Sequence, residues 1–239
     1  AEFLLVNGQS FRIKRQDIPS LFLLALLYLM SAVFLFWGYK FMASGVATTI
    51  HFMYPVLTTL IMMIFFHEKK SLWRMAAIAL AVTGVFFLSS GDGTGSVTWS
   101  GIFIVLLSAL GYALYLVTVS QLKNLEMKGL KMTFYVFLFG GILLFTGTEI
   151  SGIGLQAIRY RTTLGNLVML ALVPTVISNL ALVRAIKNIG STLTSVLGAM
   201  EPVTAVCVGI AIFGEPFTRS IALGILLIIS AVTVIILKR

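Results

Sequence analysis

Two ionisable side chains, Glu201 and His51, stand near the middle of long apolar runs in this 239-residue sequence. A charged group at the depth of a lipid bilayer costs roughly 2.5–3.5 kcal/mol on insertion scales, so such residues face the interior of a helix bundle. Glu201 could contact a substrate or couple a proton, and a structural carboxyl bonded to a neighbouring helix fits equally well. His51 could relay protons, although a lone histidine in such a run more often hydrogen-bonds across helices.

Familiar catalytic motifs are missing from the sequence. His67 and Glu68 form an H-E pair, but no second histidine follows at the spacing that a zinc protease requires. Cys207 is the single cysteine, and the two aspartates, Asp17 and Asp92, fall in the segments between the apolar runs. We therefore expect no enzyme, no cofactor and no metal site, and keep a membrane-embedded enzyme only as an alternative.

The composition of the chain is that of a membrane protein. Hydrophobic residues make up 59% of it, charged residues only 10%, and its mean hydropathy is +1.05, whereas a soluble domain carries about 25% charged residues. A helix needs about 20 apolar residues to cross a bilayer, and the period-two alternation of transmembrane strands is missing. We predict an all-α integral membrane protein, a polytopic helix bundle of about eight transmembrane helices: 18–40, 44–66, 72–89, 99–121, 130–148, 164–186, 190–213 and 217–237.

Positive charge is unevenly distributed across these spans. When the spans alternate in direction, 13 of the 17 Lys and Arg residues fall on one side of the membrane. The other side holds four: Lys40, Arg159, Arg161 and Arg219. Because positively charged loops stay in the cytoplasm, both ends of this chain are predicted to be cytoplasmic in a multi-pass protein of the inner membrane. The net charge of +9 then reflects topology and indicates no nucleic-acid partner.

An internal repeat relates the two parts of the sequence. At an offset of 147 residues three spans overlay three others, and several rare residues coincide: Lys40 with Lys187, Ser44 with Ser191, Pro55 with Pro202, and Glu68 with Glu215. Five predicted spans separate the starts of the two copies, so the second copy is inverted in the membrane, as in many secondary transporters. We divide the chain into an incomplete first repeat of three spans, 1–89, and a second repeat of five spans, 99–237.

The paired prolines and glutamates are predicted to have structural roles. Pro55 and Pro202 each remove a backbone hydrogen bond within a span and are therefore predicted to kink their helices. Glu68 and Glu215 end their spans on opposite faces of the membrane, and we expect each to fix the turn to the next span.

The sequence resembles the EamA-type permeases of the drug/metabolite transporter superfamily in three stretches: ASGVATTIHFMYPVLTTLIMMIFFHE, GIFIVLLSALGYALYLVTVSQL and GSTLTSVLGAMEPVTAVCVGIAIFGE. The resemblance covers nearly all of 18–237 and implies a pattern of two five-helix repeats. Compared with that pattern, we expect the first two helices to be missing. Because those helices help to form the central cavity of the family, a fragment that does not transport remains an alternative.

The repeat and the resemblance together predict a secondary transporter that uses no ATP. It would move small organic metabolites by alternating access, as an exporter of amino acids or related compounds. Its expected partners are the lipid bilayer and a small-molecule substrate, with a homodimer as an open alternative. Ionisable, amide and aromatic residues within the spans are the candidates for the substrate cavity: Glu201, His51, Tyr54, Tyr28, Trp37, Tyr112 and Asn179.

Overall fold

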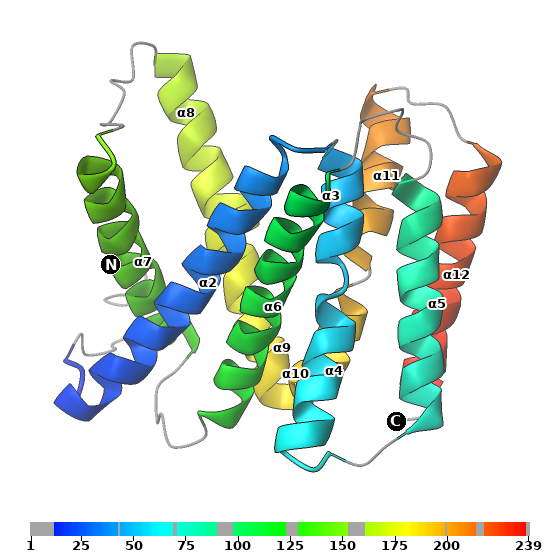
Figure 1. Ribbon diagram of the computed structural model, residues 1–239, viewed down its shortest axis with the longest axis horizontal. Helices are drawn as coiled ribbons and strands as arrows, with labels where there is room; N and C mark the ends of the chain where they lie inside the picture. Colours follow the sequence, from blue (N-terminus) through cyan, green and yellow to red (C-terminus); the bar gives the residue numbers. More distant parts are fainter. Residues whose placement is uncertain are drawn as a thin grey trace. The chain divides into compact units, whose positions relative to one another are not determined.

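The computed structural model describes residues 12–42, 44–68, 71–89, 98–122, 129–152, 161–198, 200–213 and 218–237. Within these ranges the regular structure is helical throughout, with no strand (Figure 1). The predicted all-α fold is therefore confirmed for the part of the chain that the structure describes.

Five of the predicted spans form uninterrupted helices: α2 (Ile18–Gly38), α5 (Leu72–Ser89), α6 (Trp99–Gln121), α7 (Gly129–Ile150) and α12 (Arg219–Leu237). A short 3-10 turn, η1 (Arg15–Asp17), leads into α2. Among the described residues, three helical segments are long and apolar enough to cross a membrane: Arg15–Gly38, Trp99–Gln121 and Gly129–Ile150.

The predicted span 44–66 consists of two helices, α3 (Ser44–His51) and α4 (Tyr54–Phe65). In the turn between them, the N–H of Met53 donates to the carbonyl three residues earlier at 3.0 Å, a tighter spacing than the four residues of an α-helix. Pro55 explains the break, because it has no N–H to donate and its fixed φ suits the first turn of a new helix. The sequence predicted a kink here, and the structure has a turn of two residues, Phe52 and Met53, between two helices.

The predicted span 190–213 is interrupted at the corresponding place. Its first helix, α10 (Ser191–Leu197), is capped at its C-terminus by Gly198, and its second, α11, runs over Met200–Phe213. At the repeat offset of 147 residues, Tyr54 at the start of α4 falls on Glu201, the second residue of α11. Discontinuous helices at corresponding positions of two halves are typical of secondary transporters, in which they surround the substrate site.

The predicted span 164–186 also departs from one regular helix. It comprises α8 (Arg161–Leu170), a π-helical segment η2 (Ala171–Ile177) and α9 (Ser178–Ile189). Pro174 lies within the π-helical segment. Because proline lacks a backbone N–H, it cannot make the regular hydrogen bond of an α-helix, which favours a locally widened turn.

The helices fall into two compact units, and neither unit coincides with a predicted repeat. Unit 1 combines residues 12–29 and 118–189, which hold the first part of α2, the end of α6, and α7 to α9. Unit 2 combines residues 30–117 and 190–237, which hold the remainder of α2 and α6, both interrupted helices, α5 and α12.

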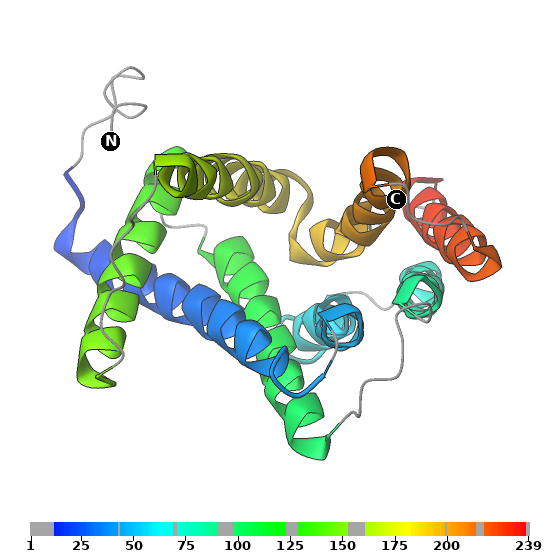
Figure 2. The same cartoon turned by 90° about the horizontal axis from the view of Figure 1, so that it is seen from above.

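Within unit 2, the corresponding helices α5 and α12 lie side by side (Figures 1 and 2). A glycine on α5 permits their close approach. A Cβ atom at Gly84 would lie 2.9 Å from the carbonyl oxygen of Gly224 on α12, and 2.7 Å from the side chain of Ile228. Only a residue without a side chain fits at this crossing.

Candidate functional site

Three ring side chains of unit 2 gather at the break between α3 and α4. His51 ends α3, Tyr54 begins α4, and Tyr112 lies on α6. The His51 ring lies 5.7 Å from each tyrosine ring, and the two tyrosine rings meet edge to face at 4.8 Å and 89°. Such perpendicular pairs are favourable for aromatic rings. We call His51, Tyr54 and Tyr112 the ring cluster, and three of the seven predicted cavity residues belong to it.

A chain of hydrogen bonds fixes the orientation and the tautomer of His51. The hydroxyl of Ser108 on α6 donates to the backbone carbonyl of Ser31 on α2 at 2.6 Å, and lies 3.0 Å from Nδ1 of His51. A serine hydroxyl has one proton, and the Ser31 carbonyl can only accept. Nδ1 of His51 must therefore carry the proton and donate it to Ser108. In the neutral ring, Nε2 then holds a lone pair.

The sequence interpretation missed the role of Ser108. A small residue within a span fits close helix packing equally well, so its type gave no reason to pair it with His51. The helical spacing between Ser108 and Tyr112, four residues apart on one face of α6, is the signal that could have suggested a shared site.

The second helix break lies against the ring cluster. Tyr54 is only 2% exposed, and its hydroxyl occupies the space beside Gly198, where a Cβ atom would lie 2.1 Å from that oxygen. Gly198 adopts right-handed helical angles, φ −56° and ψ −20°, so its backbone does not require a glycine. The requirement is steric, because the tyrosine hydroxyl fills the place of a side chain. The breaks of the two interrupted helices thus meet at this contact.

Glu201 lies in the first turn of α11, directly beyond this contact. Its backbone N–H donates to the carbonyl of Gly198 at 2.9 Å, and its carboxylate is close enough to Tyr54 to interact with it electrostatically. Tyr54 and Glu201 are also corresponding residues at the repeat offset of 147. The predicted candidates His51, Tyr54, Tyr112 and Glu201 therefore form one neighbourhood in unit 2.

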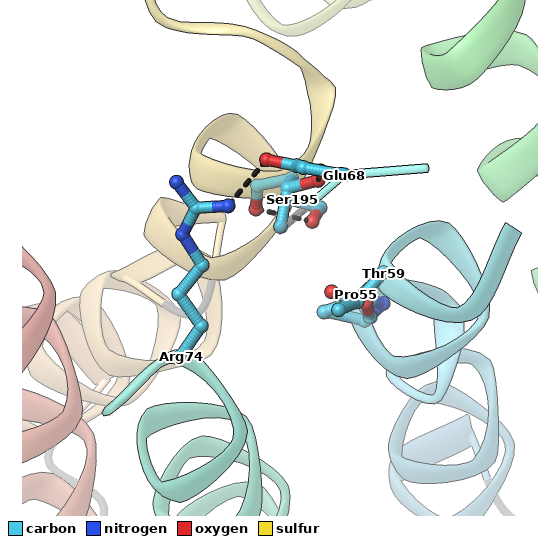
Figure 3. Close-up of polar contacts among 6 residues, drawn as sticks. Pro55, Thr59, Glu68, Arg74 and Ser195 are labelled. Carbon is cyan, nitrogen blue, oxygen red and sulfur yellow. Dashed lines mark hydrogen bonds and ion pairs between the residues drawn. The ribbon is translucent and has the colours of Figure 1, made fainter. Parts of the chain in front are cut away.

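A second polar network in unit 2 surrounds Glu68 (Figure 3). One carboxylate oxygen of Glu68 forms an ion pair with Arg74 of α5, and the other accepts a 2.7 Å hydrogen bond from the hydroxyl of Thr192 on α10. His67, the preceding residue, has a positive φ of 52°, as expected in a tight turn. Glu68 thus joins the turn after α4 to two other helices, and Arg74 and Thr192 are partners that the sequence did not indicate.

Two further candidates meet in unit 1. Tyr28 of α2 makes a side-chain hydrogen bond with Asn179 of α9, which is 4% exposed. The Tyr28 ring also meets Phe137 of α7 edge to face at 5.5 Å. These residues join three helices of unit 1.

The remaining candidates lie elsewhere. Trp37 of α2 is 46% exposed and packs against Phe34 and Phe41 rather than against the ring cluster. Pro55 is buried at the start of α4. Glu215 and the side chain of Pro202 lie outside the described residues.

Metal-binding side chains do not gather in the described ranges. No group of three or more His, Cys, Asp or Glu residues there could hold a metal ion. The ring cluster with Glu201 offers instead one carboxylate, one imidazole lone pair and the faces of aromatic rings, which are groups that recognise an organic solute.

Comparison with known proteins relates the chain to membrane transporters. The uncharacterized transporter YdfC of Bacillus subtilis is 26% identical over 212 residues, which cover 87% of this chain and 68% of the relative. An uncharacterized transporter of Archaeoglobus fulgidus is 24% identical over 231 residues, or 95% and 81% of the two chains. The uncharacterized inner membrane transporter YedA of Escherichia coli K12 is 24% identical over 196 residues, or 82% and 63%.

A solved structure and a family model complete the comparison. A solved crystal structure, 15% identical in sequence, matches this chain with a TM-score of 0.84. The match covers all of this chain and 83% of the other, and it shows that the two share a fold. The family model of EamA-like transporters matches residues 3–90 and 99–237, on both sides of a short gap. The chain, a polytopic helical membrane protein, therefore belongs to the EamA-like transporter family.

Proposed function

We propose that this protein is a secondary transporter that carries small organic metabolites across the inner membrane by alternating access, without ATP. We further propose that it exports amino acids or related compounds, with both ends of this chain in the cytoplasm. Family membership and the transporters among its relatives support transport itself. The proposal adds the substrate class, the direction and the mechanism.

The contact between Tyr54 and Gly198 is the observation that carries this proposal. A helix that is interrupted inside a membrane leaves backbone N–H and C=O groups without their regular partners, and such groups are tolerated where they line a cavity or bind a solute. At the two turns the N–H groups of Met53 and Glu201 bond carbonyls only three residues earlier, and the contact of Tyr54 with Gly198 brings the two turns into one neighbourhood. The side chains of His51, Tyr112 and Glu201 supply the polar and aromatic groups around it.

Alternating access requires two states of similar energy. Tyr54 and Glu201 occupy corresponding positions of the two predicted repeats. This correspondence supports two such states, because an inverted repeat can exchange the conformations of its two copies. In the predicted topology the turn after α4 faces the cytoplasm. We infer that the Glu68 network with Arg74 and Thr192 holds that end of unit 2 together, and that it breaks when the site opens to the cytoplasm.

Counterflow in liposomes tests the proposed function. The full-length protein is purified, reconstituted and loaded with one unlabelled amino acid at millimolar concentration, and uptake of the labelled compound is followed without ATP. Protein-free liposomes and a Tyr39→Phe variant, which loses an exposed hydroxyl outside the ring cluster, serve as controls. Saturable accumulation of at least one amino acid or related compound supports the proposal. Failure of a broad metabolite panel to move, together with chemical turnover of a lipid, would overturn it.

A further inference from the structure

The neighbourhood of the two helix breaks contains hydrogen-bond acceptors that are not engaged. The proton on Nδ1 of His51 is used in the bond to Ser108, and the Ser108 proton is used in the bond to Ser31. Nε2 of the neutral His51 ring is therefore an acceptor, and no other hydrogen bond of His51 occurs among the described residues. A ligand that contacts this nitrogen must bring a proton donor.

Glu201 is a second acceptor, and none of the described basic side chains forms an ion pair with it. Within the described part of the chain, Arg74 forms its ion pair with Glu68. Glu201 is an exposed residue of the structure although it lies beside the buried Tyr54. Its position in the first turn of α11 also places its negative charge at the positive end of the helix dipole. That end is consequently less available to an anionic ligand.

The aromatic faces of the ring cluster favour the same kind of ligand. Tyr54 and Tyr112 are perpendicular, and the His51 ring is tilted by 47° and 43° to them, so ring faces and edges point in several directions around the break. A cation within about 6 Å of the centre of a tyrosine ring is attracted by the negative face of the ring. A carboxylate, an imidazole lone pair and tyrosine faces all attract a protonated amine.

We propose that His51, Tyr54, Tyr112 and Glu201 form a subsite for the protonated amine of a small organic ligand. Glu201 supplies the countercharge, Nε2 of His51 accepts one N–H of the ligand, and the tyrosine rings contact the remaining face of the ammonium group. This inference rests on the proposed function, since it assigns the amine-recognising part of the same transport site. It goes further by giving the head group that the site selects.

Binding of three probes that share a phenylethyl group to the full-length protein in lipid nanodiscs tests the subsite. The probes are 2-phenylethylammonium, neutral 2-phenylethanol and anionic 3-phenylpropanoate, measured by titration calorimetry at pH 7. We expect the ammonium probe to bind at least tenfold more tightly than the alcohol, and the carboxylate to bind most weakly. Equal affinities for the ammonium probe and the alcohol would overturn the inference.

Two substitutions locate the binding to the named residues. Glu201→Gln keeps the shape and removes the charge, and should weaken binding of the ammonium probe at least tenfold. The matched control is Glu149→Gln, on the exposed surface of α7, which should bind as the wild type does. An unchanged affinity of Glu201→Gln for the ammonium probe would contradict the assignment.

His51→Asn provides an independent measurement if Glu201→Gln does not fold. The asparagine amide can replace the Nδ1 donor to Ser108, but it has no atom at the position of Nε2. The variant should therefore remain folded and lose affinity for the ammonium probe severalfold, with little change for the alcohol. A variant that folds and binds both probes as the wild type does would overturn the role of Nε2.

Transport and binding failures can be told apart. If liposomes show counterflow of a metabolite while the ammonium probe has no advantage over the alcohol, the amine subsite is wrong and the transporter stands. If the ammonium probe binds selectively through Glu201 and no solute moves, the subsite stands and the proposed function is wrong.

Discussion

The hydroxyl of Thr192 donates a 2.7 Å hydrogen bond to the carboxylate of Glu68, although 124 residues separate the two in the sequence. Thr192 lies on α10 in the second predicted repeat, and Glu68 follows α4 in the first. The same carboxylate is paired with Arg74 at the start of α5. One side chain therefore joins both predicted repeats at one end of unit 2.

Removing either partner of this contact should lower the free energy of unfolding, and the two losses should overlap. Glu68→Gln leaves Arg74 without its ion pair, and Thr192→Val removes the donor to the carboxylate. Because Glu68 and Arg74 are 25% and 31% exposed, solvent weakens the interaction, and we expect each substitution to lower the free energy of unfolding by about 1 kcal/mol. Thermal unfolding of both single variants and the double variant in detergent measures the coupling. The double variant should lose less than the sum of the single losses, whereas strictly additive losses would contradict a shared network.

Transport should depend on the space that Gly198 leaves for Tyr54. In Gly198→Ala the new Cβ atom would lie 2.1 Å from the Tyr54 hydroxyl, so the two helix breaks must separate or the ring must move. We expect the initial rate of counterflow to fall at least tenfold. Removing the hydroxyl in a Gly198→Ala/Tyr54→Phe double variant leaves the nearest ring carbon 3.4 Å away and should restore much of the rate.

The control for this pair is Gly140→Ala on α7, where a Cβ atom would meet no other atom within 4 Å. This variant should transport as the wild type does. A double variant as slow as Gly198→Ala alone would show that the loss does not arise from the tyrosine hydroxyl.

The predicted topology places positions 92 and 126 on opposite sides of the membrane, so cysteines there should react differently with an impermeant maleimide. In a Cys207→Ser background, a cysteine at Asp92 should react with an impermeant maleimide added outside intact cells. A cysteine at Glu126 should react only after the membrane is permeabilised, because the loop between 99–121 and 130–148 is predicted to be cytoplasmic. The reverse pattern would show that the chain is inserted in the opposite orientation.

The sequence predicted the elements of the fold better than their continuity. The spans at 72–89 and 99–121 match α5 and α6, because a long apolar run determines a membrane helix almost by itself. Pro55 identified the place of the disturbance at 44–66, yet whether a proline kinks or interrupts a helix depends on the tertiary contacts around it. Here the surrounding rings and Gly198 pack around a two-residue turn between two helices.

The candidate site was predictable in its ionisable residues and less so in its aromatic ones. Glu201 and His51 stood out because polar groups are rare in such spans, and the structure places them in one neighbourhood. Trp37 and Tyr112 were chosen alike from residue type, but only Tyr112 joins the ring cluster. The direction in which an aromatic side chain points is set by helix rotation, which a uniformly apolar span does not reveal. Tyr54 and Glu201 can be paired from the 147-residue offset in the sequence alone. The pairing indicates a shared site only because the structure also places the two residues close together.

The central claim is that the two helix breaks around Tyr54, Gly198 and Glu201 form the transport site. Its most direct test compares counterflow and thermal unfolding on the same preparations of wild type, Glu201→Gln and the control Glu149→Gln. We predict that Glu201→Gln lowers the initial rate of counterflow at least tenfold while its unfolding temperature stays close to that of the wild type and of the control. A wild-type rate in Glu201→Gln, or a loss of transport that only parallels a loss of folding, would contradict the claim.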